Sequence, residues 1–393
     1  MEKGPLIERF NSMFGTGPAR LFIAPARVNL IGEHTDHQGG YVLPCAVHLR
    51  SACVVRPRED HLLRMAASDL PGIVEADIRD LSGYALIPWG AYQIGVAHIM
   101  QEKGYRVTGM DMLFDETVPH GSGLSSSAAI EVVTATVIAT LSSETAGTPI
   151  DFPELSVIAQ SAENDYVGMN CGIMDQFASA MGKKDHAIFL RCADLSYRYI
   201  TADFRSSGIT LMICNTNKPR ALIESAYNER RAECDIAFRA VKEEARIEYL
   251  AQLTPEAFHR FKYNIEDPVA RKRAEHVVYE NYRTIQACTL LEERNFDAFG
   301  KLMDDSHNSL RDLFEVTGKE LDAMVEAARA QKGVLGARMT GAGFGGCAIA
   351  LVRNEACGDF IRNVARIYNE KTGYNAAFYP AVVSDGACEV MID

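Results

Sequence analysis

A glycine- and serine-rich segment, Gly121-Ser-Gly-Leu-Ser-Ser-Ser127, carries the clearest chemical signal in the sequence. It runs directly into an apolar, helix-like stretch, Ala128–Leu141. Free backbone amides and the dipole at a helix N-terminus both favour negative charge, so this segment has the composition needed to hold a polyphosphate. It lacks the lysine of a GxxxxGK[ST] loop and is therefore not a loop of that type. A serine-rich N-cap on an ordinary helix is the alternative.

A second cluster, Arg27–Gly40, concentrates charged and imidazole side chains between two short apolar runs, Leu21–Ala26 and Tyr41–His48, which predict strands. Charged residues beside buried sequence are more often a site than a solvated turn, although a turn is possible. His34 and His37 have carboxylates next to them, which also allows a metal site, but no HExxH helix accompanies them. Such donors and acceptors suit sugar hydroxyl groups, and we favour sugar binding over metal binding.

A late glycine cluster, Gly341-Ala-Gly-Phe-Gly-Gly346, formally matches the GxGxxG pattern of dinucleotide-binding proteins. That pattern requires a helix after the glycines, whereas a strand-like run, Cys347–Val352, follows here. A close backbone approach to a ligand or to a neighbouring loop explains so many glycines better.

Composition narrows the class of protein. The chain has 393 residues, 47% of them hydrophobic, which is enough for two packed lobes. With 40 Lys and Arg against 52 Asp and Glu, its net charge of −12 argues against a nucleic-acid partner. Ten cysteines without a CxxC pair read as reduced thiols, and the N-terminal sequence resembles neither a signal peptide nor a membrane anchor. We therefore expect a cytoplasmic protein that uses neither a membrane nor a nucleic acid.

Hydrophobic periodicity changes along the chain near residue 205. The first part mixes strands and helices, whereas the second begins with a strand-like run and is rich in long helical patterns. These patterns predict an N-terminal lobe over residues 1–205 and a C-terminal lobe over residues 206–393. The predicted strands include Met110–Phe114 and Thr210–Cys214, and the predicted helices are Trp89–Glu102, Pro153–Tyr166, Gly172–Met181, Ala221–Arg246, Glu275–Glu293 and Phe296–Leu313.

Taken together and in order, these segments resemble the galactokinase branch of the GHMP small-molecule kinases. The resemblance rests on Arg27-Val-Asn-Leu-Ile-Gly-Glu-His-Thr-Asp36, on Pro119-His-Gly-Ser-Gly-Leu-Ser-Ser-Ser-Ala-Ala129 and on Arg338-Met-Thr-Gly-Ala-Gly-Phe-Gly-Gly-Cys347. A fourth block, Glu163-Asn-Asp-Tyr-Val-Gly-Met-Asn-Cys-Gly-Ile-Met-Asp-Gln176, is also similar to the family. The resemblance spans nearly the whole chain, and the first segment separates galactokinases from other members.

The resemblance implies an α+β, two-lobed GHMP kinase fold. Its N-terminal domain would be ribosomal-protein-S5-like, its C-terminal domain ferredoxin-like, and its active site would lie in the cleft between them. The implied reaction is transfer of the γ-phosphoryl group of ATP, with Mg²⁺, to the C1 hydroxyl of galactose. The implied partners are therefore a small-molecule sugar and MgATP. The oligomeric state is left open, with a monomer favoured.

The resemblance also implies a role for each matched residue. Asp175 would be the catalytic base, and Arg27 its electrostatic partner. Asp175 falls at the start of a predicted helix, where the dipole favours the ionised form that a base requires. The sugar would be held by Glu33, His34, Thr35, Asp36, Gly172, Asp175 and Tyr227, the ATP phosphates by Gly121, Ser122, Gly123, Leu124, Ser125, Ser126 and Ser127, and Mg²⁺ by Ser127 and Glu163.

One departure from the family concerns the sugar. Galactokinases usually continue the first segment with Tyr-Asn, where this chain has His37-Gln38. A histidine there adds a possible cation, which would suit the carboxylate of galacturonate, so galacturonate kinase is the alternative to galactokinase. A non-catalytic sensor of galactose and ATP is a further alternative, but Ser125–Ala129, Asp175 and Arg27 are all present.

Overall fold

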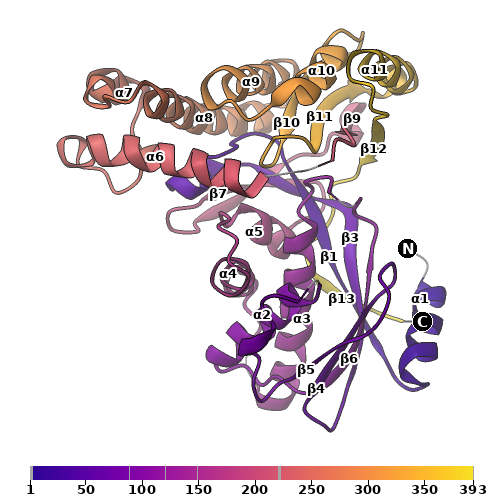
Figure 1. Cartoon of the computed structure of the whole chain (residues 1–393). Helices are drawn as coiled ribbons and strands as arrows, with labels where there is room; N and C mark the ends of the chain where they lie inside the picture. Colours follow the sequence, from indigo (N-terminus) through magenta and orange to yellow (C-terminus); the bar gives the residue numbers. More distant parts are fainter. Residues whose placement is uncertain (1–2, 88, 120, 148, 220–222, 393) are drawn as a thin grey trace.

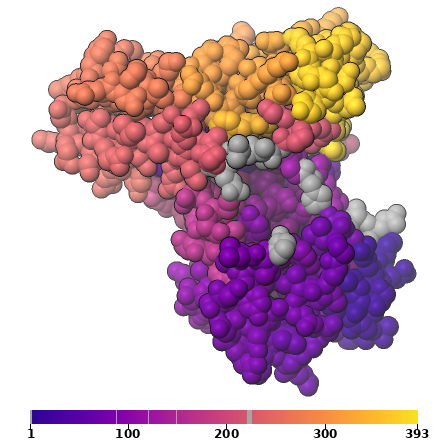
Figure 2. Space-filling model, in the orientation of Figure 1, coloured from indigo at the N-terminus to yellow at the C-terminus, as the bar shows by residue number. Residues whose placement is uncertain are grey.

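The computed structural model describes residues 3–87, 89–119, 121–147, 149–219 and 223–392, which form two lobes (Figure 1). The C-terminal lobe lies across one end of the N-terminal lobe and extends beyond it on the left of Figures 1 and 2. His120 of the quoted segment and residues 221 and 222 of the predicted helix lie outside the described residues.

The N-terminal lobe is built on a six-stranded sheet. Its strands are β1 (Arg20–Asn29), β3 (Pro44–Pro57), β4 (Leu62–Ala67), β5 (Val74–Asp77), β6 (Met110–Glu116) and β13 (Cys388–Val390), and its helices are α1 (Lys3–Phe14), α2 (Ala91–Glu102), α3 (Ser126–Ala146), α4 (Phe152–Ser161) and α5 (Met174–Met181). The strand order is β13-β1-β3-β6-β4-β5, with β4 and β6 parallel and the other neighbours antiparallel. Helix α1 lies on one face and α2–α5 lie on the other (Figure 1).

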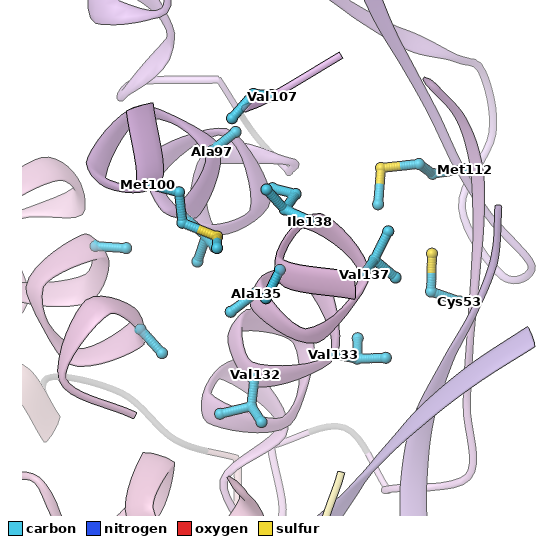
Figure 3. Packing of buried hydrophobic residues seen from close by; sticks show 14 of the residues in the cluster. Cys53, Ala97, Met100, Val107, Met112, Val132, Val133, Ala135, Val137 and Ile138 are labelled. Carbon is cyan, nitrogen blue, oxygen red and sulfur yellow. The ribbon is translucent and has the colours of Figure 1, made fainter. Parts of the chain in front are cut away.

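Helix α3 is apolar on most sides because the sheet and the other helices enclose it (Figure 3). Val133 and Val137 point towards Cys53 and Met112 of the sheet, whereas Ala135 lies on the side of α2. Among the described residues, α3 alone is long and apolar enough to span a membrane, but 72% of its most apolar window is buried within the fold. A core helix passes the same test of length and composition, so this is weak evidence for a membrane span.

The C-terminal lobe combines a four-stranded antiparallel sheet with a layer of helices. Its elements are β9 (Ile209–Asn215), α6 (Ile223–Ala245), α7 (Pro255–Phe261), α8 (Pro268–Glu292), α9 (Phe296–Ser309), α10 (Gly318–Arg329), β10 (Val334–Thr340), β11 (Cys347–Arg353), α11 (Cys357–Thr372) and β12 (Ala377–Ala381). The strand order β12-β9-β11-β10, with helices after β9 and after β11, is that of a ferredoxin-like fold. The expected α+β fold class is therefore confirmed.

Two further features join the lobes. Strand β13 follows β12 in the sequence but pairs with β1, so the end of the chain returns to the N-terminal sheet beside α1 (Figure 1). The C-terminal sheet buries alternate residues of β9 on opposite faces: Met212 packs among its own helices, while Leu211 and Ile213 pack with Val28 of β1. A smaller sheet of β2 (Tyr41–Val42), β7 (His186–Arg191) and β8 (Tyr197–Thr201) lies nearby. The boundary between residues 205 and 206 stays a prediction.

Most predicted elements are present with displaced ends, and two differences concern the site. Arg27 belongs to strand β1 and not to the loop, because the β1–β3 pairing continues to Asn29. The helix predicted over Pro153–Tyr166 changes at Ala162 into a π-helix, η3 (Ala162–Val167), which ends at left-handed Gly168. A wider π turn repositions the side chains that follow it, here including Glu163.

Two helical glycines provide a matched test of this packing. A Cβ atom on Gly300 of α9 would lie 2.1 Å from the Leu335 carbonyl oxygen, whereas one on exposed Gly358 of α11 would meet only an arginine side chain at 3.5 Å. We expect Gly300→Ala to destabilise the fold by about 1–3 kcal/mol, and Gly358→Ala to stabilise it by about 0.5 kcal/mol. Urea unfolding midpoints measure both changes, and equal effects at the two sites would contradict the packing of α9 on β10.

Candidate active site

A cavity of about 330 Å³ lies between the lobes and is lined by both. The N-terminal lobe contributes β1, the Leu30–Gly40 loop, the glycine-serine loop Gly121–Ser127 and the segment 163–175. The C-terminal lobe contributes α6 and the late glycine cluster Gly341–Gly346. The lining residues are Arg27, Glu33, His34, Asp36, Gly123, Ser125, Ser126, Ser127, Glu163, Gly168, Met169, Asn170, Cys171, Gly172, Met174, Asp175, Tyr227, Asn228, Gly341 and Ala342.

Arg27 and Asp175 form a two-point ion pair at the centre of the cavity wall. Arg27 Nε donates to Asp175 Oδ1 and Nη2 donates to Oδ2, both at 2.7 Å. Nη1 donates to the Gly123 carbonyl at 2.9 Å, which ties the pair to the glycine-serine loop. The arginine side chain is 4% exposed and the aspartate side chain 29% exposed, so the carboxylate is the member of the pair that faces the cavity. Two parallel N–H···O bonds favour this orientation of the carboxylate.

The three consecutive serines that open α3 each donate to a different carboxylate. Ser125 donates to Asp175, and Ser127 lies 3.4 Å from Glu163 Oε1. Ser126 donates to Glu116 at the end of β6, with distances of 2.9 and 2.8 Å to its two oxygens. The hydroxyls therefore point in three directions, and the backbone amides of the first turn of α3 are left without side-chain caps.

Glu163 lies in a group of buried carboxyls. Burial, and then the negative charge of Asp175, raises the pKa of Glu163 to about 7. Burial also raises the pKa of Glu131 well above its usual range, and the charge of Glu163 acts in the same direction. The Gln176 amide donates to both, at 2.7 Å to Glu163 and 3.0 Å to Glu131. Among the described residues, no group of three or more His, Cys, Asp or Glu is arranged to hold a metal ion.

Glu33 is held by residues of both lobes. Its carboxylate lies 2.5 Å from Arg338 Nη2 and accepts hydrogen bonds from the Gly341 amide at 2.9 Å and from Asn29 Nδ2 at 2.8 Å. Burial nevertheless raises the pKa of Glu33, because Arg338 offsets only part of the desolvation. Glu33 lines the cavity with its position fixed by these contacts.

His34 and Tyr227 line the cavity together. His34 adopts a left-handed backbone (φ 61°), and its Nε2 lies 3.2 Å from the Ala342 carbonyl, which only accepts, so Nε2 carries the proton. Burial keeps the pKa of His34 well below its usual range, so the ring is neutral. The Tyr227 ring of α6 lies with its centroid 5.6 Å from that of His34.

Asp36 faces Gly172 at very close range. A Cβ atom on Gly172 would lie 1.8 Å from Asp36 Oδ2, so only glycine allows this carboxylate to pack here. Burial, and then the charge of Asp175, raises the pKa of Asp36 to about 6. Two acidic groups, Asp36 and Asp175, thus share one end of the cavity.

Two residues of the Leu30–Gly40 loop that were singled out in the sequence lie outside the cavity lining. Thr35, predicted to bind substrate, does not line the cavity: its side chain is buried, and its hydroxyl lies within hydrogen-bonding distance of the Gly32 and Tyr41 carbonyls at 2.9 and 2.8 Å. It closes the turn. His37 also lies outside the cavity lining, edge-on to Tyr227 with ring centroids 5.8 Å apart, and burial lowers its pKa to about 4. His37 is therefore neutral and does not supply a cation to the cavity.

The glycine-serine loop is close to the late glycine cluster. A Cβ atom on Gly341, which has a φ of 83°, would lie 3.1 Å from the Gly123 carbonyl oxygen. This confirms the predicted close backbone approach, and strand β11 follows the cluster where a dinucleotide-binding fold would require a helix. Of the predicted phosphate-binding residues, Gly123, Ser125, Ser126 and Ser127 line the cavity, whereas Ser122 and Leu124, which are buried, and Gly121, which is exposed, do not.

Three residues in or next to the site were missed by the sequence reasoning: Asn228, which lines the cavity, and Arg338 and Glu116, which hold residues that line it. Arg338 stands in a quoted segment, but no role was predicted for it, and Glu116 and Asn228 were not singled out. A charged residue in the middle of an apolar strand, as Arg338 is in β10, is a signal of buried pairing that could have been used. No comparable signal marks Glu116 or Asn228.

Comparison with known proteins defines the class first. Residues 91–183 match the GHMP kinases N terminal domain, and residues 287–371 match the GHMP kinases C terminal domain. A crystal structure of a mevalonate kinase, 18% identical, superposes with a TM-score of 0.63 over 93% of this chain and 99% of that chain, which supports the fold alone. The fold is that of a GHMP kinase.

The particular family follows from the first segment and from full-length relatives. Residues 8–57 match the galactokinase galactose-binding signature. Curated galactokinases from Clostridium tetani and Bacillus subtilis are 46% and 44% identical, covering 99% and 97% of this chain and 98% and 97% of their own lengths. A structure of Lactococcus lactis galactokinase complexed with galactose is 40% identical, with a TM-score of 0.92 over 98% of this chain and 99% of that chain. The chain belongs to the galactokinase family.

The contribution of the buried Arg338–Glu33 pair to the stability of the protein can be tested by mutation. Arg338→Met leaves Glu33 and Glu280 buried without this partner, so we expect it to destabilise the protein by about 3–5 kcal/mol. Arg366→Met removes an exposed pair with Glu370 and is the matched control, with an expected change within about 0.5 kcal/mol. Urea unfolding measures both, and a mild effect of Arg338→Met would contradict the structural role of the pair.

Proposed function

We propose that the protein transfers the γ-phosphoryl group of ATP to the C1 hydroxyl of galactose, giving galactose 1-phosphate and ADP. The observation that carries this proposal is the fixed Asp175–Arg27 pair, which lies between the glycine-serine loop and the Leu30–Gly40 loop in one cavity. Membership of the galactokinase family supports the choice of sugar. Galacturonate is less well supported, because His37, its intended partner, does not line the cavity.

The sugar is proposed to contact the residues at the Asp36 end of the cavity. Asp36 and Glu33 offer carboxylate oxygens to hydroxyl groups, and Tyr227 offers a phenol whose pKa burial holds well above its usual range, so that it stays a donor. His34 is neutral and uses Nε2 for the Ala342 carbonyl. Gly172 completes this end by leaving room for Asp36.

The ATP phosphates are proposed to lie along residues 121–127 at the N-terminus of α3. The first-turn amides carry no side-chain cap, so they are available to phosphate oxygens. Ser127 and Glu163 supply an all-oxygen donor pair, 3.4 Å apart, which fits Mg²⁺ held jointly by protein and phosphates. Bound Mg²⁺ would neutralise charge on the phosphates.

Asp175 is proposed to accept the proton of the C1 hydroxyl as its oxygen attacks the γ-phosphorus and ADP departs. Arg27 orients the carboxylate through two charge-assisted hydrogen bonds, and its buried charge offsets negative charge on the transferred group. The cavity holds both reactants at fixed places, and positioning of this kind supplies much of the rate in phosphoryl transfer.

We also propose the lobe boundary at residues 205–206, a monomeric state and a cytoplasmic location.

ADP release with MgATP and a panel of galactose, galacturonate, glucose, N-acetylgalactosamine and arabinose tests the reaction. We expect a strong preference for galactose. Asp175→Asn should lower kcat about 10²–10⁴-fold while ATP binding stays close to that of the wild type. A preference for galacturonate would contradict the proposed sugar, and binding of galactose and ATP without ADP release would indicate a sensor and not an enzyme.

The raised pKa of Asp36 predicts a pH dependence of sugar binding. Protonation removes acceptor capacity, so the KM for galactose should rise as the pH falls below about 6. Asp36→Asn should make that KM high and independent of pH. Because the folded-state pKa is raised, ionising Asp36 costs stability as the pH rises from about 4 to 6, so Asp36→Asn should also be more stable than the wild type at neutral pH. A flat wild-type KM from about pH 5 to 8 would refute this assignment.

A further inference from the structure

Ser125 stands at the N-cap position of α3 but does not cap the helix. An N-cap serine normally accepts a hydrogen bond from an amide in the first turn. Here Ser125 lies in the left-handed region (φ 63°, ψ 51°), makes no side-chain cap and donates its hydroxyl to Asp175 Oδ2. A non-glycine residue in this conformation stores strain, and such strain is concentrated at functional sites.

The oxygens of Asp175 are consequently not equivalent. Oδ2 accepts from Arg27 Nη2 and from Ser125, whereas Oδ1 accepts from Arg27 Nε. A carboxylate oxygen has two lone-pair sites, so both sites of Oδ2 are occupied, and one site of Oδ1 has no partner among the described residues. The third Arg27 nitrogen, Nη1, donates to the Gly123 carbonyl and does not contact the carboxylate.

We propose that Ser125 is a positioning residue for the catalytic base: its hydroxyl occupies Oδ2 of Asp175, so that Oδ1 is the oxygen that receives the proton of the sugar hydroxyl. This inference rests on the proposed function and deepens it, because the resemblance implied only a phosphate-binding role for Ser125. Its neighbours cannot replace it, since Ser126 and Ser127 point to Glu116 and Glu163.

In the same arrangement, the side chain of Ser125 and the backbone of α3 have different proposed functions. By donating to Asp175, the Ser125 hydroxyl leaves the first-turn amides of α3 free for phosphate. The hydroxyl thus serves the sugar's proton acceptor, and the backbone serves the nucleotide.

Ser125→Gly tests the proposal, because glycine adopts the left-handed conformation without strain and removes only the hydroxyl. A hydrogen bond to a charged group is worth about 1.5–3 kcal/mol, so kcat should fall about 10–100-fold, with the KM values for ATP and galactose within about 3-fold of the wild type. Ser156→Ala is the control: it removes a buried hydroxyl, bonded to the Pro153 carbonyl of α4, away from the cavity, and kcat should not change. A raised KM for ATP with nearly unchanged kcat would overturn the proposal in favour of a phosphate contact.

A double-mutant cycle and a crystal structure make the test independent of overall activity. In single turnovers, Ser125→Gly should add little to the loss caused by Asp175→Asn if it acts through that carboxylate, and a multiplicative loss would refute it. The crystal structure of Ser125→Gly should show the Asp175 carboxylate rotated or in two positions. An unchanged carboxylate position would overturn the proposed role of Ser125. If the wild-type protein phosphorylates no sugar, that result alone would refute only the proposed reaction, and the crystal structure would still test the role of Ser125.

Discussion

The buried contact between Arg338 and Glu33 is the interaction on which the site depends. Arg338 comes from β10 of the C-terminal lobe, and Glu33 comes from the loop that follows β1 of the N-terminal lobe. Glu280 of α8 accepts from the Gly32 amide at 2.9 Å; burial alone would raise its pKa, but Arg283 and Arg338 bring it down to about 2. An ionised pair in the interior is costly to break, so this contact fixes the Leu30–Gly40 loop relative to both lobes.

With the Leu30–Gly40 loop fixed in this position, several carboxyl groups lie close together in one cavity. Among the lining residues, Asp36, Glu163 and Asp175 face a single permanent cation, Arg27, while Glu33 is already paired with Arg338. Burial is the main cause of the raised pKa values of Asp36 and Glu163, about 6 and 7, and the negative charge of Asp175 adds to it. A cavity with excess negative charge, in a protein with a net charge of −12, is consistent with the proposal that ATP binds together with Mg²⁺, which offsets the charge of the phosphates.

The sequence predicted which residues lie in the site better than it predicted the orientation of their side chains. Arg27 and Asp175, separated by 148 positions, could be brought together only through the family resemblance, and their contact is present. The hydroxyl of Thr35 bonds within its own turn and not towards the cavity, a distinction that sequence spacing does not report. Helices and strands were found from their periodicity, whereas the π turn at Ala162 and the left-handed backbone at Ser125 depend on tertiary contacts that no local pattern encodes.

The left-handed backbone at Ser125 affects both the start of helix α3 and the hydrogen bonds of Asp175. Had this residue capped α3 in the ordinary way, its hydroxyl would occupy a first-turn amide that is proposed to bind phosphate, and Asp175 would lose a hydrogen-bond donor. The turn is held because Gly123 is tied to Arg27, Ser126 to Glu116 and Ser125 to Asp175, so the loop cannot relax without losing several charge-assisted contacts at once. Strain in one residue is thereby supported by the Arg27–Asp175 ion pair, and the geometry of the proposed base and of the amides proposed to bind phosphate is set together.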